Sequence, residues 1–88
     1  MTFNDVRRIL KEIDFDMNCC NVLEGKTVLA GDGVVVFREN GVYKVCYVER
    51  NEQYGIEEYA NEHDASRAFL KKLKEGFGRW YDFARYIQ

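Results

Sequence analysis

The 88-residue chain contains no proline, one histidine and only three cysteines. Its apolar runs are short, as at Val34 to Phe37, whereas a membrane-spanning helix needs roughly 18 consecutive apolar residues. The first residues show no basic region followed by an apolar stretch, the pattern of a secretory leader. We therefore expect no membrane partner and a cytoplasmic protein.

The few histidines and cysteines also argue against a metal site. A structural zinc ion needs about four ligands, and the chain has no C-x-x-C pair to combine with His63. The adjacent Cys19 and Cys20 cannot bridge each other without strain, so we expect reduced thiols. Cys46 lies in a Val- and Tyr-rich run and is expected to be a small buried hydrophobe. No metal or cofactor is predicted.

What the chain does contain fits one folded domain over residues 1–88, because 47% of it is apolar and 32% is charged. Apolar side chains recur every three or four residues from Phe3 to Met17, which predicts an amphipathic helix. Thr2 and Asp5 resemble a capping box at its start. Asp14, Asp16 and Asn18 compete for backbone hydrogen bonds, so the helix should fray between Ile13 and Met17.

The middle of the chain has the composition of β-strands. Strands are predicted at Lys26–Ala30, Val34–Glu39 and Val42–Arg50, with a further short strand possible at Asn21–Leu23. The dipeptide Asn40-Gly41 favours a two-residue type I′ turn, which places Val36 opposite Val45 in an antiparallel hairpin. The more aliphatic face, with Val35, Phe37, Val42, Cys46 and Val48, is expected to face the helices. Tyr43 and Tyr47 would then line the opposite face.

The second half of the chain continues with a turn at Asn51–Gly55 and a stretch, residues 56–60, that reads either as a short edge strand or as the start of a helix. A long helix capped by Asn61 should end near Gly76. A last short helix is predicted from the spacing of Trp80, Phe83 and Ile87, which would complete the core, while Tyr81 and Tyr86 would be exposed. The predicted fold class is α+β: a helix, a three- to four-stranded antiparallel sheet, then one long and one short helix.

Charge is distributed unevenly. Residues 49–64 carry six acids against Arg50 alone, and residues 65–88 carry six bases against two acids. The six acids are Glu49, Glu52, Glu57, Glu58, Glu62 and Asp64. Such a block creates a negative field that attracts a basic partner. A plain alternative is that part of it is ordinary helix design, since acids favour helix N-termini.

The sequence offers little for catalysis, and we predict no catalytic residues. His63 lies in a polar run at a helix start, and neither a nucleophile motif nor a phosphate loop is present. Glu57 and Glu58 would point to opposite faces of a strand, which separates them as an acid–base pair. An enzyme built on a cysteine and His63 is left as a minor alternative.

A family resemblance covers residues 34–73. The stretch Val42–Arg50, a turn, and the run from Glu58 to Ala65 before a Phe-Leu helix are similar to small bacterial immunity proteins of polymorphic-toxin and contact-dependent growth inhibition systems. The resemblance implies a non-catalytic cytoplasmic inhibitor that covers a cognate toxin, in many cases a basic nuclease. Under it, the six acids at 49–64 would be the partner-binding surface, together with Tyr43 and Tyr47.

An alternative function is a small nucleic-acid-binding module that uses Arg79, Trp80, Tyr81, Arg85 and Tyr86 for stacking and phosphate contact. The order of elements resembles a double-stranded-RNA-binding domain. In that family, however, lysines stand at the start of the second helix, where this chain has Asn61-Glu62-His63-Asp64. Acids at that position would repel phosphates, so nucleic acid is not the expected partner.

Overall fold

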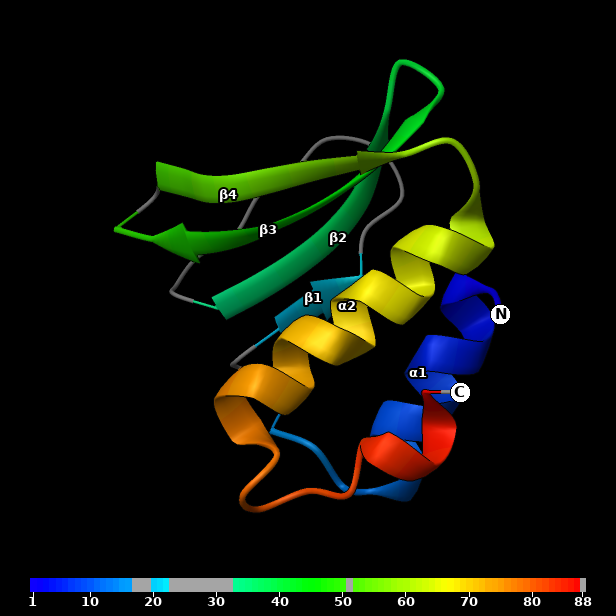
Figure 1. Cartoon of the computed structure of the whole chain (residues 1–88), viewed down its shortest axis with the longest axis vertical. Coiled ribbons are helices and arrows are strands. Elements are labelled where there is room, and N and C mark those ends of the chain that lie inside the picture. The colour runs from blue at the N-terminus through cyan, green and yellow to red at the C-terminus, as the bar shows by residue number, and fades with distance from the viewer. Residues whose placement is uncertain (17–19, 23–32, 51, 88) are drawn as a thin grey trace.

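The computed structural model describes residues 1–16, 20–22, 33–50 and 52–87, with residues 20–22 described by their backbone alone. Figure 1 shows two helices packed on one face of a four-stranded sheet, the α+β architecture that the sequence predicts. In chain order the elements are α1 (Phe3–Glu12), β1 (Cys20–Val22), β2 (Gly33–Glu39), β3 (Val42–Glu49), β4 (Glu52–Tyr59), α2 (Glu62–Phe77) and the 3-10 turn η1 (Ala84–Tyr86).

Helix α1 begins where its capping signal predicts. The Thr2 hydroxyl accepts a hydrogen bond from the backbone N–H of Asp5 at 3.2 Å, and the Asp5 carboxylate accepts one from the backbone N–H of Thr2 at 2.8 Å. Two N–H groups that the first helical turn leaves unpaired are thereby satisfied. The helix ends at Glu12, and Asp14 takes a left-handed backbone with φ of 54°.

The hairpin of β2 and β3 has the predicted register. Asn40 and Gly41 both have positive φ, 53° and 78°, as a type I′ turn requires. Val36 pairs with Val45, and the remaining pairs follow the same register along the whole hairpin. A two-residue turn with these residues therefore determined which side chains share each face.

Two features of the sheet differ from the prediction. β1 lies at Cys20–Val22 and pairs with β2 in parallel, so only β2, β3 and β4 are antiparallel. β4 begins at Glu52 instead of residue 56, so the turn predicted at Asn51–Gly55 is wrong. Gly55, with φ of 61°, lies instead within the strand, at an irregularity in the pairing of β3 with β4. Glycine adopts this conformation without a Cβ penalty, so the strand continues through the bulge. The strand predicted at Lys26–Ala30 lies outside the described residues.

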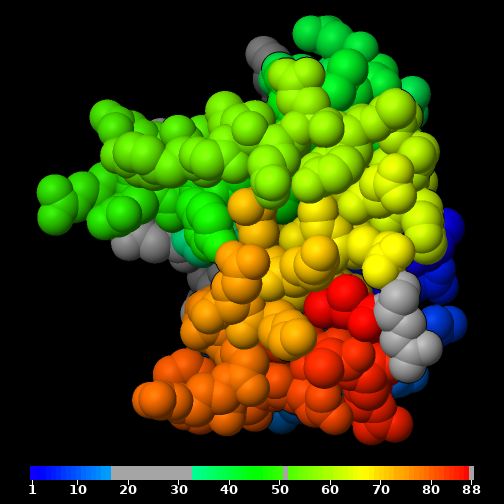
Figure 2. Space-filling view, viewed as in Figure 1, coloured from blue at the N-terminus to red at the C-terminus, as the bar shows by residue number. Residues whose placement is uncertain are grey.

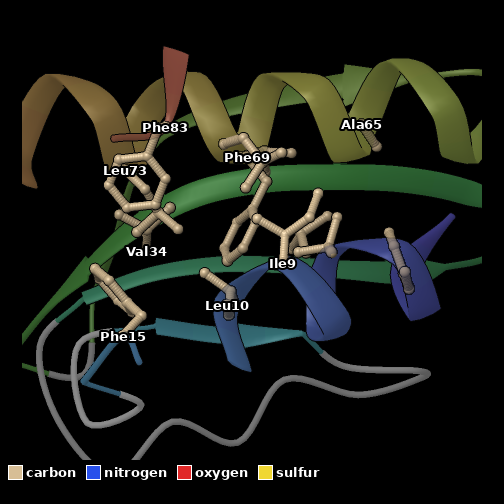
Figure 3. Packing of buried hydrophobic residues seen from close by; sticks show 13 residues of the cluster. Ile9, Leu10, Phe15, Val34, Ala65, Phe69, Leu73 and Phe83 are labelled. Carbon is tan, nitrogen blue, oxygen red and sulfur yellow. The ribbon is translucent and has the colours of Figure 1, made fainter. Parts of the chain in front are cut away.

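The predicted orientation of the sheet is wrong. Val34, Val36 and Val45 face the helices and pack in one core with α1, α2 and Phe83, as Figure 3 shows for Val34. Val35, Phe37, Cys46 and Val48 form a second buried cluster on the other face. Both faces are apolar, so hydrophobicity alone did not distinguish them.

Tyr43 and Tyr47 consequently lie on the helix side of the sheet. The Tyr43 ring makes an edge-to-face contact with Phe3 at a centroid distance of 5.8 Å, and the Tyr47 hydroxyl donates a hydrogen bond to Glu75 of α2 at 3.3 Å. An amphipathic ring suits the margin of a helix layer, where its body packs on apolar groups and its hydroxyl reaches polar ones.

The C-terminal segment also differs from the prediction. Helix α2 is capped by Asn61, whose side chain accepts from the backbone N–H of Asp64 at 2.8 Å, and it ends at Phe77 with Gly78 as its C-cap. The residues that follow turn back instead of continuing a helix. Phe83 and Tyr81 therefore reach Phe15 in the core, whereas the Trp80 side chain is 67% exposed.

Candidate partner-binding surface

Strand β4 forms one edge of the sheet. The strand order is β1-β2-β3-β4, so within the described residues only β3 pairs with β4. Its residues from Glu52 to Glu58 are all exposed, and only Tyr59 is half-buried. Its outer edge therefore presents backbone N–H and C=O groups that an added strand can pair with.

The six predicted acids lie along this strand and its two ends. Figure 2 shows β4 and the start of α2 as one continuous stretch of the surface. Glu49 is the last residue of β3. Strand β4 contains Glu52, Glu57 and Glu58, and the first turn of α2 contains Glu62 and Asp64. The acids therefore follow one edge of the sheet from the end of β3 to the start of α2, with Glu57 and Glu58 on opposite faces, and we call them the acidic edge.

Three members of the acidic edge already have partners within the chain. Glu57 forms an ion pair with Lys72 of α2 at 2.8 Å, and Glu62 accepts a hydrogen bond from the backbone N–H of Phe3 at 2.6 Å. Asp64 accepts from the side-chain amide of Asn61 at 3.1 Å. These three carboxylates hold β4 and α1 against α2 or cap the helix, so much of their effect is structural.

Glu49 and Glu52 are arranged differently, since they face each other across the β3–β4 ladder. Like charges directly opposite in a sheet are unfavourable. The Tyr54 hydroxyl donates a 2.6 Å hydrogen bond to Glu52, and this bond raises the pKa of Tyr54 because the ionised phenol could not donate it. Within the described residues neither Glu49, Glu52 nor Glu58 forms an ion pair, although Glu58 lies opposite Lys44 in the register.

A groove adjoins this carboxylate pair. It encloses about 500 Å³ between the β3–β4 hairpin and the C-terminal half of α2, under the projecting hairpin end in Figure 2. Its described lining is mostly apolar and aromatic: Gly33, Val34, Tyr47, Val48, Glu49, Tyr54, Lys72, Gly76 and Phe77. Tyr54, which is 49% exposed, lines the groove and donates its hydroxyl hydrogen bond to Glu52 of the acidic edge.

Lys72 links β4 to α2 inside this groove. Its ammonium lies 4.8 Å from the centre of the Tyr47 ring as well as 2.8 Å from Glu57. Burial lowers the pKa of Lys72, but the hydrogen bond and charge of Glu57, with Tyr47 and Glu75, outweigh it, so the net pKa is raised. Burial raises the pKa of the Tyr47 phenol. At pH 7 Lys72 is therefore a charged ammonium and Tyr47 an uncharged phenol, and the two form a cation–π contact.

Sequence reasoning missed two exposed apolar side chains. Trp80, predicted in the core, is on the surface with the Arg79 guanidinium 5.9 Å from its ring centre. Ile56 of β4 is 49% exposed and was not singled out. The two glycines around Phe77 were the available signal for Trp80, because they end the helix and interrupt the spacing on which the core prediction depended.

Among the described residues, the thiol of Cys46 and the imidazole of His63 lie in different surroundings. Cys46 is buried as predicted, and burial raises the pKa of its thiol. His63 is exposed, with its Nδ1 2.7 Å from the amine of Met1. Across residues 1–16, 33–50 and 52–87, no three His, Cys, Asp or Glu side chains are placed to hold a metal ion. Of the described helices, none has the length and apolar character needed to cross a bilayer.

Comparison of the chain with protein families, with curated proteins and with solved structures finds no match.

Proposed function

We propose that this chain is a non-catalytic immunity protein that binds and neutralises a basic toxin domain through the acidic edge. The observation that carries the proposal is the exposed edge strand β4, whose outer backbone groups pair with no other described strand and which carries Glu52, Glu57 and Glu58. A partner strand added there would gain main-chain hydrogen bonds, and its basic side chains would meet carboxylates.

The arrangement favours a basic partner over a second copy of this chain. Two β4 strands paired edge to edge would bring two sets of glutamates together, and like charges across an interface are costly. A basic strand instead relieves the repulsion between Glu49 and Glu52. Half-exposed Tyr54 and Ile56 would supply the apolar contact area that binding needs besides charge.

The test uses the C-terminal domain encoded by the gene next to this one, co-expressed with the full chain and purified. We expect a one-to-one complex and rescue of growth from the toxin. Glu52→Lys should weaken binding at least tenfold at low salt, mostly through a slower association rate, with a smaller difference at high salt. Glu52→Lys also replaces a repulsive pair with an attractive one, so the variant should fold.

Asp82→Lys is the matched control, because it changes the net charge equally on an exposed residue of the C-terminal segment. Asp82→Lys should leave binding within about twofold of the unmodified chain. Absence of a complex, or equal weakening by the two substitutions, would overturn the proposal.

A nucleic-acid-binding module is the second candidate, and exposed Trp80 beside Arg79 is the observation that favours it. Trp80 is the single tryptophan, so its fluorescence reports stacking on a base directly. Saturable quenching by a short single-stranded oligonucleotide that weakens steeply with salt would support this candidate. Unchanged fluorescence would exclude stacking on Trp80.

A further inference from the structure

A second charged depression lies where the two ends of the chain meet. Figure 1 shows the N- and C-terminal ends side by side next to the first half of α2. Between them is a depression of about 420 Å³. Its described lining comes from α1, α2 and the C-terminal segment: Met1, Asp5, Arg8, Ile9, His63, Arg67, Arg85 and Tyr86. We call it the arginine pocket.

The arginine pocket has a clear excess of positive charge. Arg8, Arg67 and Arg85 line it, and Asp5 is its only described carboxylate. Asp5 is already engaged, because it accepts from the backbone N–H of Thr2 at 2.8 Å and lies 3.5 Å from the Arg8 guanidinium. Three guanidinium groups around one depression repel each other, and a bound anion would remove that repulsion.

Arg67 adds an independent observation. Its Nε is buried and has no hydrogen-bond acceptor among the residues that the structure describes. No ion pair with Arg67 occurs within the described residues. Arg67 lines the depression without a carboxylate partner among the described residues, so its positive charge is available to an anion there.

Arg85 is held at the rim by neighbouring contacts. Its guanidinium lies 5.3 Å from the centre of the Tyr86 ring, and the Tyr86 hydroxyl donates to Glu12 of α1 at 3.3 Å. These contacts restrict the ring and the guanidinium stacked on it, so less entropy is lost when Arg85 pairs with a ligand.

We propose that the arginine pocket binds the phosphate groups of a phosphorylated ligand. A guanidinium presents a planar pair of N–H donors that matches two phosphate oxygens, and three guanidiniums suit a multiply charged group better than a single carboxylate. The pocket volume falls within the range of small-molecule sites. The proposal is independent of toxin binding, because it uses other residues than the acidic edge.

Inorganic pyrophosphate is the probe, titrated into the full chain by calorimetry at low salt. We expect saturable one-to-one binding to the unmodified chain. Arg67→Gln and Arg85→Gln should each weaken it at least tenfold. Arg85 is exposed, so its variant keeps the fold even where Arg67→Gln is destabilising.

Arg38→Gln is the matched control, because it removes one exposed arginine of β2 outside the pocket and should leave pyrophosphate binding within twofold. A short single-stranded oligonucleotide in parallel distinguishes the phosphate source. If only the binding of pyrophosphate is weakened by Arg67→Gln and Arg85→Gln, the ligand is a small molecule. If the binding of the oligonucleotide is weakened as well and is the tighter of the two, the ligand is a nucleic acid. No saturable binding of pyrophosphate, or equal weakening by Arg38→Gln, would overturn the proposal.

Discussion

Strands β2 and β4 flank the same central strand, β3, and are nearly equal in length, yet their burial is opposite. Val34 to Phe37 of β2 are all buried, whereas every residue of β4 before Tyr59 is exposed. β2 therefore contributes apolar burial on both faces of the sheet, and β4 contributes mainly backbone pairing. One strand therefore builds the core, whereas the other leaves its side chains and outer edge exposed.

An available edge strand must also avoid pairing with copies of itself. β4 has two of the devices that natural sheets use, a bulge around Gly55 and charged side chains along the strand. Lys72 attaches β4 to α2 by its ion pair with Glu57. These features hold β4 against α2 and disfavour pairing between copies without burying the strand.

The largest effect that we expect is the difference in stability lost when one apolar side chain is truncated in β2 or in β4. Phe37→Ala removes a ring that is 1% exposed and should lower the free energy of unfolding by about 3–5 kcal/mol. Ile56→Ala removes a half-exposed side chain and should cost less than about 1 kcal/mol. Urea unfolding followed by circular dichroism measures both, and a similar loss for the two variants would contradict the division between the strands.

The sequence predicted the parts of the fold that local chemistry decides. Thr2 with Asp5, Asn61 with Asp64, and Asn40-Gly41 are short-range signals, and each lies where it was expected. The face that β2 and β3 turn to the helices depends on long-range packing. Because both faces are apolar, the pattern could not decide between them.

The candidate site could be predicted only as a group of acids. The number of acids at 49–64 was visible in the sequence. Their partners were not, because the ion pair of Glu57 with Lys72 and the hydrogen bond of Glu62 with the backbone of Phe3 join residues distant along the chain. The arginine pocket was not visible at all, because Arg8, Arg67 and Arg85 come together only when both ends of the chain pack on α2.

The stability that the Lys72–Glu57 contact gives to the packing of β4 on α2 should fall at alkaline pH, as Lys72 loses its proton. Its raised pKa means that its contribution is complete below the ordinary value of 10.5 and is lost as the pH rises through the folded-state pKa. Lys72→Met should therefore reduce stability at pH 8 by about 0.5–1 kcal/mol and flatten the alkaline decline. The decline that persists in the variant belongs to phenols such as Tyr47, whose pKa is also raised.

Urea titrations between pH 8 and 11 test this, with Glu57→Gln as the matched variant. The two substitutions together should cost less than the sum of each alone, because they remove one shared interaction. Strict additivity would show that the 2.8 Å contact between Lys72 and Glu57 does not stabilise the attachment.

The smallest effect expected is an increase in stability at the end of β4. Glu49→Gln removes one member of the Glu49–Glu52 pair and should raise the free energy of unfolding by a few tenths of a kcal/mol at low salt, fading as salt is added. The same change should slow association with a basic toxin domain. Both results together would mean that Glu49 serves a partner and not its own strand. Glu58→Gln is the control: Glu58 lies opposite Lys44, so its substitution should not stabilise the free chain. A loss of stability in Glu49→Gln would mean that Glu49 supports the hairpin and would remove it from the proposed surface.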